Sequence, residues 1–189
     1  MCSHQSLTQQ AHDAIVCCLQ PGDWALDATA GNGRDTLFLA RQVGPSGHVW
    51  AFDVQSEALK VTEQRLRGAG CAETVSLIQA SHDRMLEYLP AATLGQIKAI
   101  QFNLGYRPGG DKRLITRPQT TLPALTAACR LLHPEGLLSL LVYRGHPGGM
   151  EEYQAILAWL DGAGLGIKQI NICAQQAPVL FLLRHSSPH

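Results

Sequence analysis

The chain has 189 residues, of which 46% are apolar, 16% charged and 6% aromatic, so it is long enough for one compact domain and too short for two catalytic domains. Fifteen basic side chains balance fifteen acidic ones. The chain therefore has no net charge that would attract nucleic acid or a membrane surface, and its composition excludes a disordered polyelectrolyte. The charge is uneven, since residues 1–87, 88–150 and 151–189 carry −4, +5 and −1. The excess of positive charge in residues 88–150 marks either a solvated face or a local binding surface.

The six cysteines include no C-x-x-C pair and no histidine at ligand spacing. Neither a zinc site nor a redox dithiol is therefore indicated, and we expect reduced, packed thiols and no metal. The first thirteen residues lack the basic and apolar regions of a signal peptide, and no run of about 18 apolar residues occurs. We therefore expect a cytoplasmic protein without membrane contact.

The predicted elements begin with an amphipathic helix over 7–19, which ends before Pro21-Gly22. A short apolar strand over 24–27 then leads into a glycine loop and a helix over 35–42. Strand, glycine loop and helix in this order are typical of the start of a nucleotide-binding fold.

The alternation of strands and helices continues to the end of the chain. We expect strands over 48–53, 75–80, 97–102, 136–143, 167–173 and 179–184, and helices over 56–67, 83–88, 118–132 and 149–163. No helix separates the last two strands. The pattern predicts a single α/β domain over 1–189, with a mostly parallel seven-stranded sheet, one antiparallel strand and helices on both faces.

Ligands of such a sheet bind at the carboxyl ends of its strands, where the strand order reverses. Gly31 and Gly33 lie there and would let a ligand approach the backbone at the start of the next helix. The alternative interpretation of these two glycines is an ordinary turn. Asp53 lies 20 residues after Gly33, at the usual place of a carboxylate that binds two ribose hydroxyls. Thr36 stands where a nicotinamide-binding loop would have a third glycine, so S-adenosylmethionine fits better.

Two further polar positions at this edge have two interpretations each. Asp27 either caps a helix or contacts the cationic amino-acid part of the cofactor, and its place just before the loop favours the contact. Ser81 and His82 follow the third strand, where they either contact an adenine or form a helix cap with an exposed histidine.

A long irregular segment, 103–116, leaves the fourth strand and begins with Asn103-Leu104-Gly105-Tyr106. Its spacing matches the Asn-Pro-Pro-Tyr of methyltransferases that act on amino nitrogens, in which amide and backbone oxygens accept hydrogen bonds from the amine. The amide of Asn103 would then aim the nitrogen lone pair at the methyl sulfonium, and Tyr106 would stack on a base. Leu104-Gly105 replaces Pro-Pro, so this loop is less rigid.

His146 lies in Tyr143-Arg144-Gly145-His146-Pro147-Gly148-Gly149, after the fifth strand. An imidazole titrates near neutrality and could take a proton from an alkylammonium. The alternative interpretation is that His146 has no catalytic role.

Four stretches together closely resemble one family of S-adenosylmethionine-dependent methyltransferases. They are DATAGNGRDTLFLA at 27–40, FDVQ at 52–55, FNLGYRPGGDK at 102–112 and YRGHPGG at 143–149. This family was long labelled as rRNA methylases and is now associated with methylation of tRNA 5-aminomethyl-2-thiouridine at the wobble position. The resemblance covers most of the chain.

The resemblance implies a class I methyltransferase that converts 5-aminomethyl(-2-thio)uridine of a tRNA anticodon into 5-methylaminomethyl(-2-thio)uridine. By position, the substrate-facing loops of the family fall on 103–112 and 143–149. The catalytic residues that we expect, from their spacing and chemistry, are Asn103, Tyr106 and His146. The expected cofactor-binding residues are Asp27, Thr29, Gly31, Asn32, Gly33, Asp35, Thr36, Asp53, Gln55, Ser81, His82 and Asn103. Those expected to meet the anticodon stem-loop are Arg107, Asp111, Lys112, Arg113, Arg117, Tyr143 and Arg144.

The chemistry of the residues agrees with this expectation. A primary alkylamine, with a pKa of about 10 by analogy with lysine, must lose a proton before it attacks, and Asn103 or His146 could accept a hydrogen bond or that proton. The basic residues of the irregular segment could bind phosphates, and Tyr106 or Tyr143 could stack an extruded base.

Other functions remain open from the sequence. The nearest alternative is a methyltransferase of ribosomal RNA bases, followed by a nicotinamide-dependent reductase and by a nucleoside-binding module without catalysis. The sequence leaves the oligomeric state open and allows a homodimer.

Overall fold

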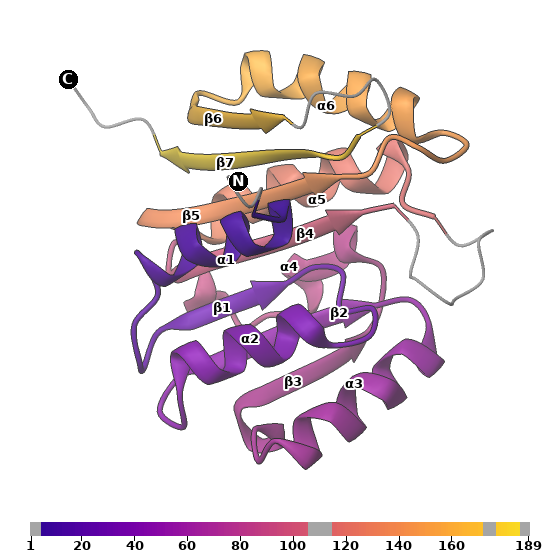
Figure 1. Ribbon diagram of the computed structural model, residues 1–189. Helices are drawn as coiled ribbons and strands as arrows, with labels where there is room; N and C mark the ends of the chain where they lie inside the picture. Colours follow the sequence, from indigo (N-terminus) through magenta and orange to yellow (C-terminus); the bar gives the residue numbers. More distant parts are fainter. Residues whose placement is uncertain (1–4, 106–114, 172–176, 186–189) are drawn as a thin grey trace.

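The computed structural model describes residues 5–105, 115–171 and 177–185. Within these residues, seven strands form one sheet in the order β3-β2-β1-β4-β5-β7-β6, in which β7 alone runs opposite to the other strands (Figure 1). The strands are β1 (Trp24–Asp27), β2 (His48–Asp53), β3 (Val75–Gln79), β4 (Ile97–Leu104), β5 (Leu132–Val142), β6 (Leu165–Asn171) and β7 (Val179–His185). This arrangement confirms the predicted α/β class and the single antiparallel strand.

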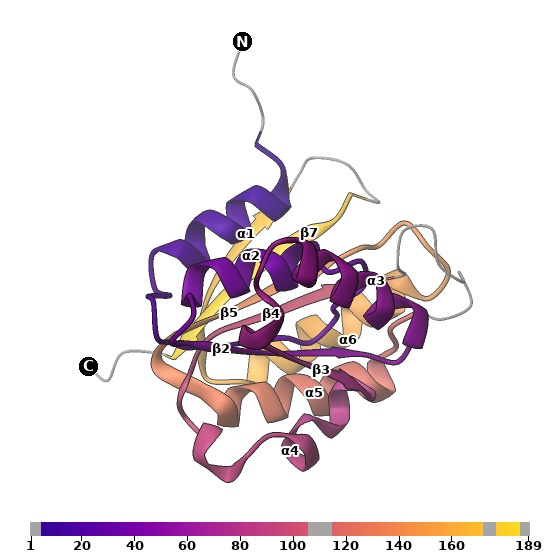
Figure 2. The same cartoon turned by 90° about the horizontal axis from the view of Figure 1, so that it is seen from below.

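Helices cover both faces of the sheet (Figures 1 and 2). One face carries α1 (Leu7–Val16), α2 (Arg34–Val43) and α3 (Ser56–Gly68), and the other carries α4 (Met85–Tyr88), α5 (Pro118–Leu131) and α6 (Gly149–Gly162). Three short 3₁₀ turns complete the described elements: η1 (Ala72–Thr74), η2 (His82–Arg84) and η3 (Ala91–Thr93). In the described part of the chain, no helix is long and apolar enough to cross a membrane.

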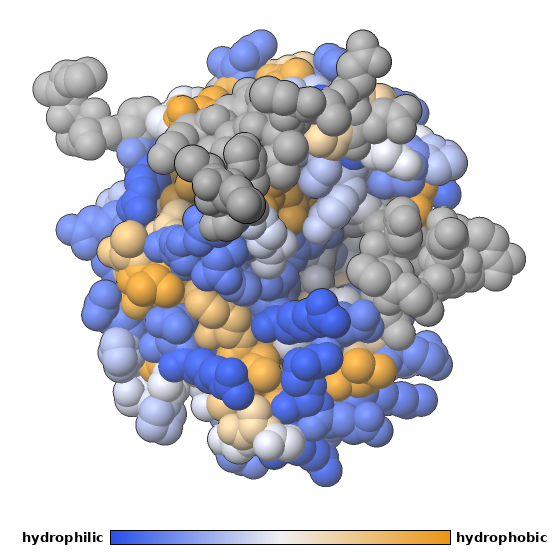
Figure 3. Space-filling view, viewed as in Figure 1, coloured by the Kyte–Doolittle hydropathy of each residue, from blue (hydrophilic) through white to orange (hydrophobic). Residues whose placement is uncertain are grey.

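The sheet separates two hydrophobic cores. The strand side chains alternate between them, so that in β4 Ile100, Phe102 and Leu104 pack on the α5 and α6 side while Ala99 packs with α1 and α2. Asn103 follows the same alternation and lies on the α1 and α2 side. On that side the outer surface is mostly hydrophilic, with small separate hydrophobic patches (Figure 3).

The structure shifts several predicted boundaries. The first helix ends at Val16 instead of residue 19, because the chain turns there with the amide of Cys18 donating to the carbonyl of Ile15. Strand β4 continues to Leu104 because it pairs with β5 that far, so Asn103 belongs to the strand and not to the loop. The expectation of packed cysteines is wrong for Cys17, which is exposed.

The glycine loop between β1 and α2 is packed tightly against α3. Gly33, just before α2, has φ +72°, and a Cβ built there would lie 2.7 Å from the side chain of Thr62. Because both the backbone conformation and the space require glycine, this position fixes how closely the loop approaches α3.

We expect Gly33→Ala to destabilise the protein more than Gly95→Ala. Both positions have a positive φ, +72° and +67°, which costs an alanine about 1 kcal/mol. Only at Gly33 does the new methyl group meet Thr62, whereas nothing lies within 4 Å at Gly95, and overpacking adds about 1–3 kcal/mol. Urea unfolding of both variants measures the difference, and equal losses would contradict the tight contact.

Candidate active site

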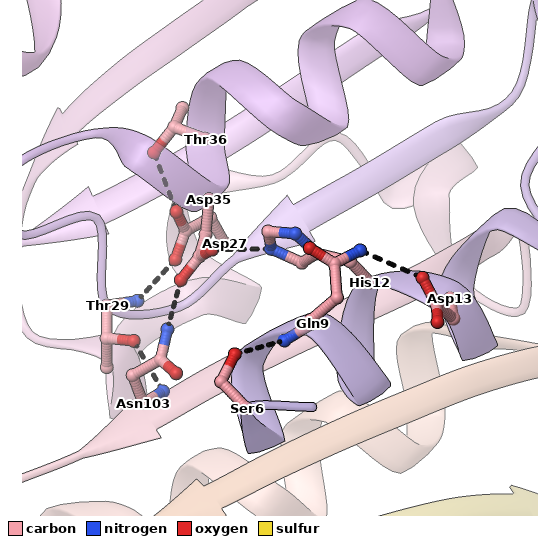
Figure 4. Close-up of polar contacts among 9 residues, drawn as sticks. All are labelled: Ser6, Gln9, His12, Asp13, Asp27, Thr29, Asp35, Thr36 and Asn103. Atoms are coloured by element: carbon pink, nitrogen blue, oxygen red, sulfur yellow. Dashed lines mark hydrogen bonds and ion pairs between the residues drawn. The ribbon is translucent and has the colours of Figure 1, made fainter. Parts of the chain in front are cut away.

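The candidate site lies where the strand order reverses, between β1 and β4. Thr29 follows β1 and Asn103 stands near the end of β4, and the backbone amide of Asn103 donates to Thr29 Oγ1 at 2.7 Å (Figure 4). This bond joins the glycine loop to the strand that leads into the segment with the Asn-x-x-Tyr spacing. The two motifs that the sequence analysis combined are therefore adjacent in space.

Asp27 is buried completely beneath the loop. One of its carboxylate oxygens accepts from Thr36 Oγ1 at 2.6 Å and the other from the backbone amide of Thr29 at 3.1 Å. Burial, together with the nearby Asp35 carboxylate, raises the pKa of Asp27 to about 7. Asp27 thus holds the loop and the start of α2 together, and its contact with the cationic amino-acid part of the cofactor stays a prediction.

Asp53 ends β2 beside the loop and is half-buried. Its Oδ2 accepts from the backbone amide of Gly31 at 2.9 Å, and its Oδ1 accepts from that of Gln55 at 2.8 Å. Each oxygen of a carboxylate carries two lone pairs and can accept more than one hydrogen bond. With Gly31 at φ +53° beside it, the donor and acceptor set fits the ribose of a nucleoside cofactor.

Two side chains of α3 donate hydrogen bonds to backbone carbonyls of the glycine loop. Thr62 Oγ1 donates to the carbonyl of Gly31 at 3.2 Å, and Arg65 Nε donates to the carbonyl of Asn32 at 2.8 Å. The sequence analysis missed both residues, because a threonine and an arginine on a helix carry no motif that distinguishes them from surface residues. Their contacts explain why the loop keeps its shape between Gly31 and Gly33.

The structure contradicts one of the two interpretations of the polar residues after β3, the helix cap with an exposed histidine. His82 is 7% exposed, so the alternative of an exposed histidine is wrong. Its ring meets Phe102 edge-on at 5.8 Å, and burial lowers its pKa. Ser81 Oγ donates to the carboxylate of Asp83 instead of capping the turn with its side chain. Contact of Ser81 and His82 with an adenine stays a prediction.

Asp35 links the loop to the end of β4 and to the first helix. Its Oδ2 accepts from Asn103 Nδ2 at 2.7 Å, and its Oδ1 contacts His12 Nε2 at 2.6 Å (Figure 4). We expected Asp35 at the cofactor, and the structure directs both of its oxygens to these partners. The sequence analysis missed His12, since its helix showed only an apolar stripe and an isolated histidine has no recognisable spacing to Asp35 or Asn103.

The segment that leaves β4 is closed at its base. The backbone amide of Thr116 donates to the carbonyl of Gly105 at 3.0 Å, and the amide of Tyr143 donates to the carbonyl of Leu104 at 2.9 Å. His146 packs into the same corner: its Nε2 lies 3.5 Å and 3.0 Å from where Cβ atoms on Gly105 and Gly149 would be. The structure therefore brings His146 to the end of β4, as the sequence predicted for this edge.

A buried carboxylate supports this corner. Glu152, in the first turn of α6, is fully buried and accepts from Thr116 Oγ1 at 2.7 Å and from Thr121 Oγ1 at 2.6 Å. Burial raises its pKa. Glu152 thereby connects α6 to α5 and to Thr116, which lies just before α5.

The residues expected to meet RNA are only partly described. Tyr106, Arg107, Asp111, Lys112 and Arg113 lie outside the described residues. Arg117 is exposed at the start of α5. Tyr143 is 42% exposed, and burial of part of its ring, followed by the nearby Asp35 carboxylate, raises its pKa. The guanidinium of Arg144 lies 4.9 Å from the ring of Tyr153, and its Nε donates to the carbonyl of Ala177 at 2.7 Å.

Solved structures with the same architecture cover nearly all of this chain. A crystal structure described as a putative rRNA-methylase from Clostridium thermocellum is 35% identical, with a TM-score of 0.90, and covers 96% of this chain and 98% of its own. A putative methyltransferase from Streptococcus mutans, solved in complex with SAH, is 31% identical, with a TM-score of 0.83, over 95% and 97%. The fold, with its glycine loop and acidic strand end, is that of a class I S-adenosylmethionine-dependent methyltransferase.

The family follows from two comparisons of the sequence. The chain belongs to the family described as "Putative rRNA methylase", whose pattern matches residues 49–180. It is also 40% identical, over 93% of its length, to the Arabidopsis thaliana protein named "tRNA (mnm(5)s(2)U34)-methyltransferase, chloroplastic", of which it spans 68%. The family resemblance stated from the sequence is confirmed.

The raised pKa of Asp27 predicts an unusual pH dependence of stability. The unfolded carboxyl ionises at about pH 4 and the folded one at about 7, so between these values the folded state binds one proton more. The free energy of unfolding therefore falls as the pH rises from about 4 to 7, by on the order of 4 kcal/mol at most, and this contribution levels off once the pH is well above the folded pKa.

Asp27→Asn removes the ionisable group and with it this pH dependence. Urea unfolding of the wild type and the variant at pH 5 and pH 8 should show the wild type losing more stability between the two values than Asp27→Asn does. Parallel behaviour of the two proteins would contradict the assignment of the raised pKa to Asp27.

Proposed function

We propose that the protein is a tRNA methyltransferase that uses S-adenosylmethionine to convert 5-aminomethyl(-2-thio)uridine at the wobble position into 5-methylaminomethyl(-2-thio)uridine. The name of the Arabidopsis relative states this modification for that protein. S-Adenosylmethionine supplies an electrophilic methyl group on a sulfonium when it is bound. The task of the chain is then to hold the cofactor and to present an uncharged amine.

The orientation of Asn103 is the observation that carries the proposal. Its backbone amide donates to Thr29 Oγ1 and its side-chain Nδ2 donates to Asp35, so the NH₂ group of the side chain is directed toward α2. The side-chain Oδ1 is the part of the amide that remains to accept a hydrogen bond from an amine. An amide oxygen in this role orients the nitrogen lone pair without adding charge.

The proposed cofactor contacts use the residues around the loop. Asp53 would accept from the ribose hydroxyls, and the backbone at Gly31 and Gly33 would approach the rest of the cofactor. His146, at the end of β4 beside Gly105, is the proposed acceptor for the proton that the alkylammonium must lose. Arg117 and the basic residues outside the described part of the chain would contact phosphates of the anticodon stem-loop.

The alternative within the same family is methylation of ribosomal RNA, which the family description names. It would use the same fold and cofactor. The identity to the Arabidopsis relative over most of the chain favours the tRNA substrate. A cytoplasmic location and a homodimer remain parts of the proposal that other measurements must test.

Nucleoside mass spectrometry tests the substrate. The purified protein is incubated with S-adenosylmethionine and, separately, with tRNA or ribosomal subunits from cells that accumulate 5-aminomethyl-2-thiouridine. We expect the precursor in tRNA to be replaced by 5-methylaminomethyl-2-thiouridine, with no new methylation of the ribosomal RNA. Asn103→Ala should bind S-adenosylhomocysteine but lose methyl transfer. A tRNA precursor left unchanged by the wild type would contradict the proposal.

Calorimetry tests the cofactor and the role of Asp53. We expect S-adenosylhomocysteine to bind and NAD not to bind. Asp53→Asn should weaken the binding by about 10- to 100-fold, since hydrogen bonds to a charged acceptor contribute about 1.5–3 kcal/mol. Asp23→Asn, outside the loop, is the matched control. Unchanged affinity in Asp53→Asn would remove the proposed ribose contact, and binding of NAD would favour a reductase.

A further inference from the structure

The first helix contributes a side chain to the candidate site. His12 lies in α1, Asp35 in the first turn of α2, and Asn103 at the end of β4, and their side chains are joined in one line (Figure 4). The distances are 2.6 Å from His12 Nε2 to Asp35 Oδ1 and 2.7 Å from Asn103 Nδ2 to Asp35 Oδ2. Both His12 and Asp35 are shielded, with side chains 17% and 16% exposed.

The chemistry of the three groups fixes their roles. An ionised carboxylate only accepts hydrogen bonds, so Asp35 requires a donor from each partner. His12 must therefore present an N–H at Nε2, and Asn103 must present its NH₂ group. The amide of Asn103 consequently cannot turn over without placing its Oδ1 against the carboxylate, which would be repulsive.

The ring of His12 is held in the orientation that this bond requires. It stacks on Phe38 with ring centroids 3.7 Å apart and planes inclined by 8°. Phe38 follows Asp35 by three residues, so both lie on the same face of α2. The stack fixes the ring plane, and the bond at Nε2 then fixes the carboxylate of Asp35.

The helix does not need this bond to stay in place. Leu7, Ala11 and Ile15 are buried in the core beneath α1, and Ser6 Oγ caps the helix by accepting from the amide of Gln9. The apolar contacts provide the anchoring, whereas His12 places one polar group on the side of α1 that faces the site.

We infer that His12 is a positioning residue for methyl transfer, which acts through Asp35 to keep the side-chain Oδ1 of Asn103 turned toward the amine. The inference rests on the proposed function, because it assigns that oxygen to the substrate. His12 does not touch the substrate or the cofactor in this scheme. Its loss should therefore lower the rate of the chemical step and leave cofactor affinity unchanged.

Two substitutions test the aromatic ring of His12 and its N–H donor separately. His12→Phe keeps an aromatic ring on Phe38 and removes the donor, whereas His12→Gln keeps an N–H donor at nearly the same distance and removes the ring. Gln9→Ala, on the same helix, is the matched control, since the side chain of Gln9 contacts Asp13 and not Asp35. Thermal unfolding and calorimetry with S-adenosylhomocysteine accompany each variant.

The activity measurement is a single-turnover rate of methyl transfer to tRNA that carries the aminomethyl precursor. We expect His12→Phe to lower this rate by about 10- to 100-fold, the effect of a misplaced reacting group, with less than a twofold change in S-adenosylhomocysteine affinity. His12→Gln should recover most of the rate, and Gln9→Ala should match the wild type. A wild-type rate in His12→Phe, equal losses in both His12 variants, or a parallel loss of cofactor affinity would each overturn the inference.

A measurement without catalysis distinguishes this inference from the proposed function. The side-chain NH₂ signals of Asn103 can be assigned in ¹⁵N-labelled protein by their loss in Asn103→Ala. We expect these signals to move in His12→Phe and to stay close to the wild-type positions in His12→Gln and Gln9→Ala. Unchanged signals in His12→Phe would overturn the positioning role. An inactive wild type with the expected shifts would instead contradict the proposed function alone.

Discussion

The site depends on the hydrogen bonds that join β1 to β4 where the strand order reverses. The strands on either side of this point lead away from each other, so their loops diverge and leave a gap at the carboxyl edge. The bond from the Asn103 amide to Thr29 crosses that gap, and the bond from the Asn103 side chain to Asp35 ties the same strand to α2. Every other feature of the site is arranged around this junction.

The electrostatics of the junction show how the fold manages several carboxylates close together. Asp27, Asp35 and Asp53 all lie near the glycine loop, and burial together with the Asp35 carboxylate raises the pKa of Asp27 to about 7. At neutral pH Asp27 therefore carries only part of a negative charge. Asp35 accepts from Asn103 Nδ2 and contacts His12 Nε2, and Asp53 accepts from the backbone amides of Gly31 and Gln55.

The fold was largely predictable from the sequence, and the site only in part. Apolar strands alternating with amphipathic helices gave the sheet and both helical layers, because burial patterns are local along the chain. The glycine loop, Asp53 and Asn103 were also found, since each directly follows a strand and must lie at the same edge. His12, Thr62 and Arg65 were not found. Each meets the loop from a helix distant in sequence, and such contacts depend on packing angles that no local pattern encodes.

The position of α1 makes the candidate site depend on strands that are distant in the sequence. This helix packs against β5 and β7, and its buried residues share a core with Leu180 and Leu182 of the last strand. The surface that the buried face of α1 covers is therefore built in part from strands that are distant in the sequence. Substitutions that loosen the packing of β7 would displace α1 and, with it, the contact between His12 and Asp35.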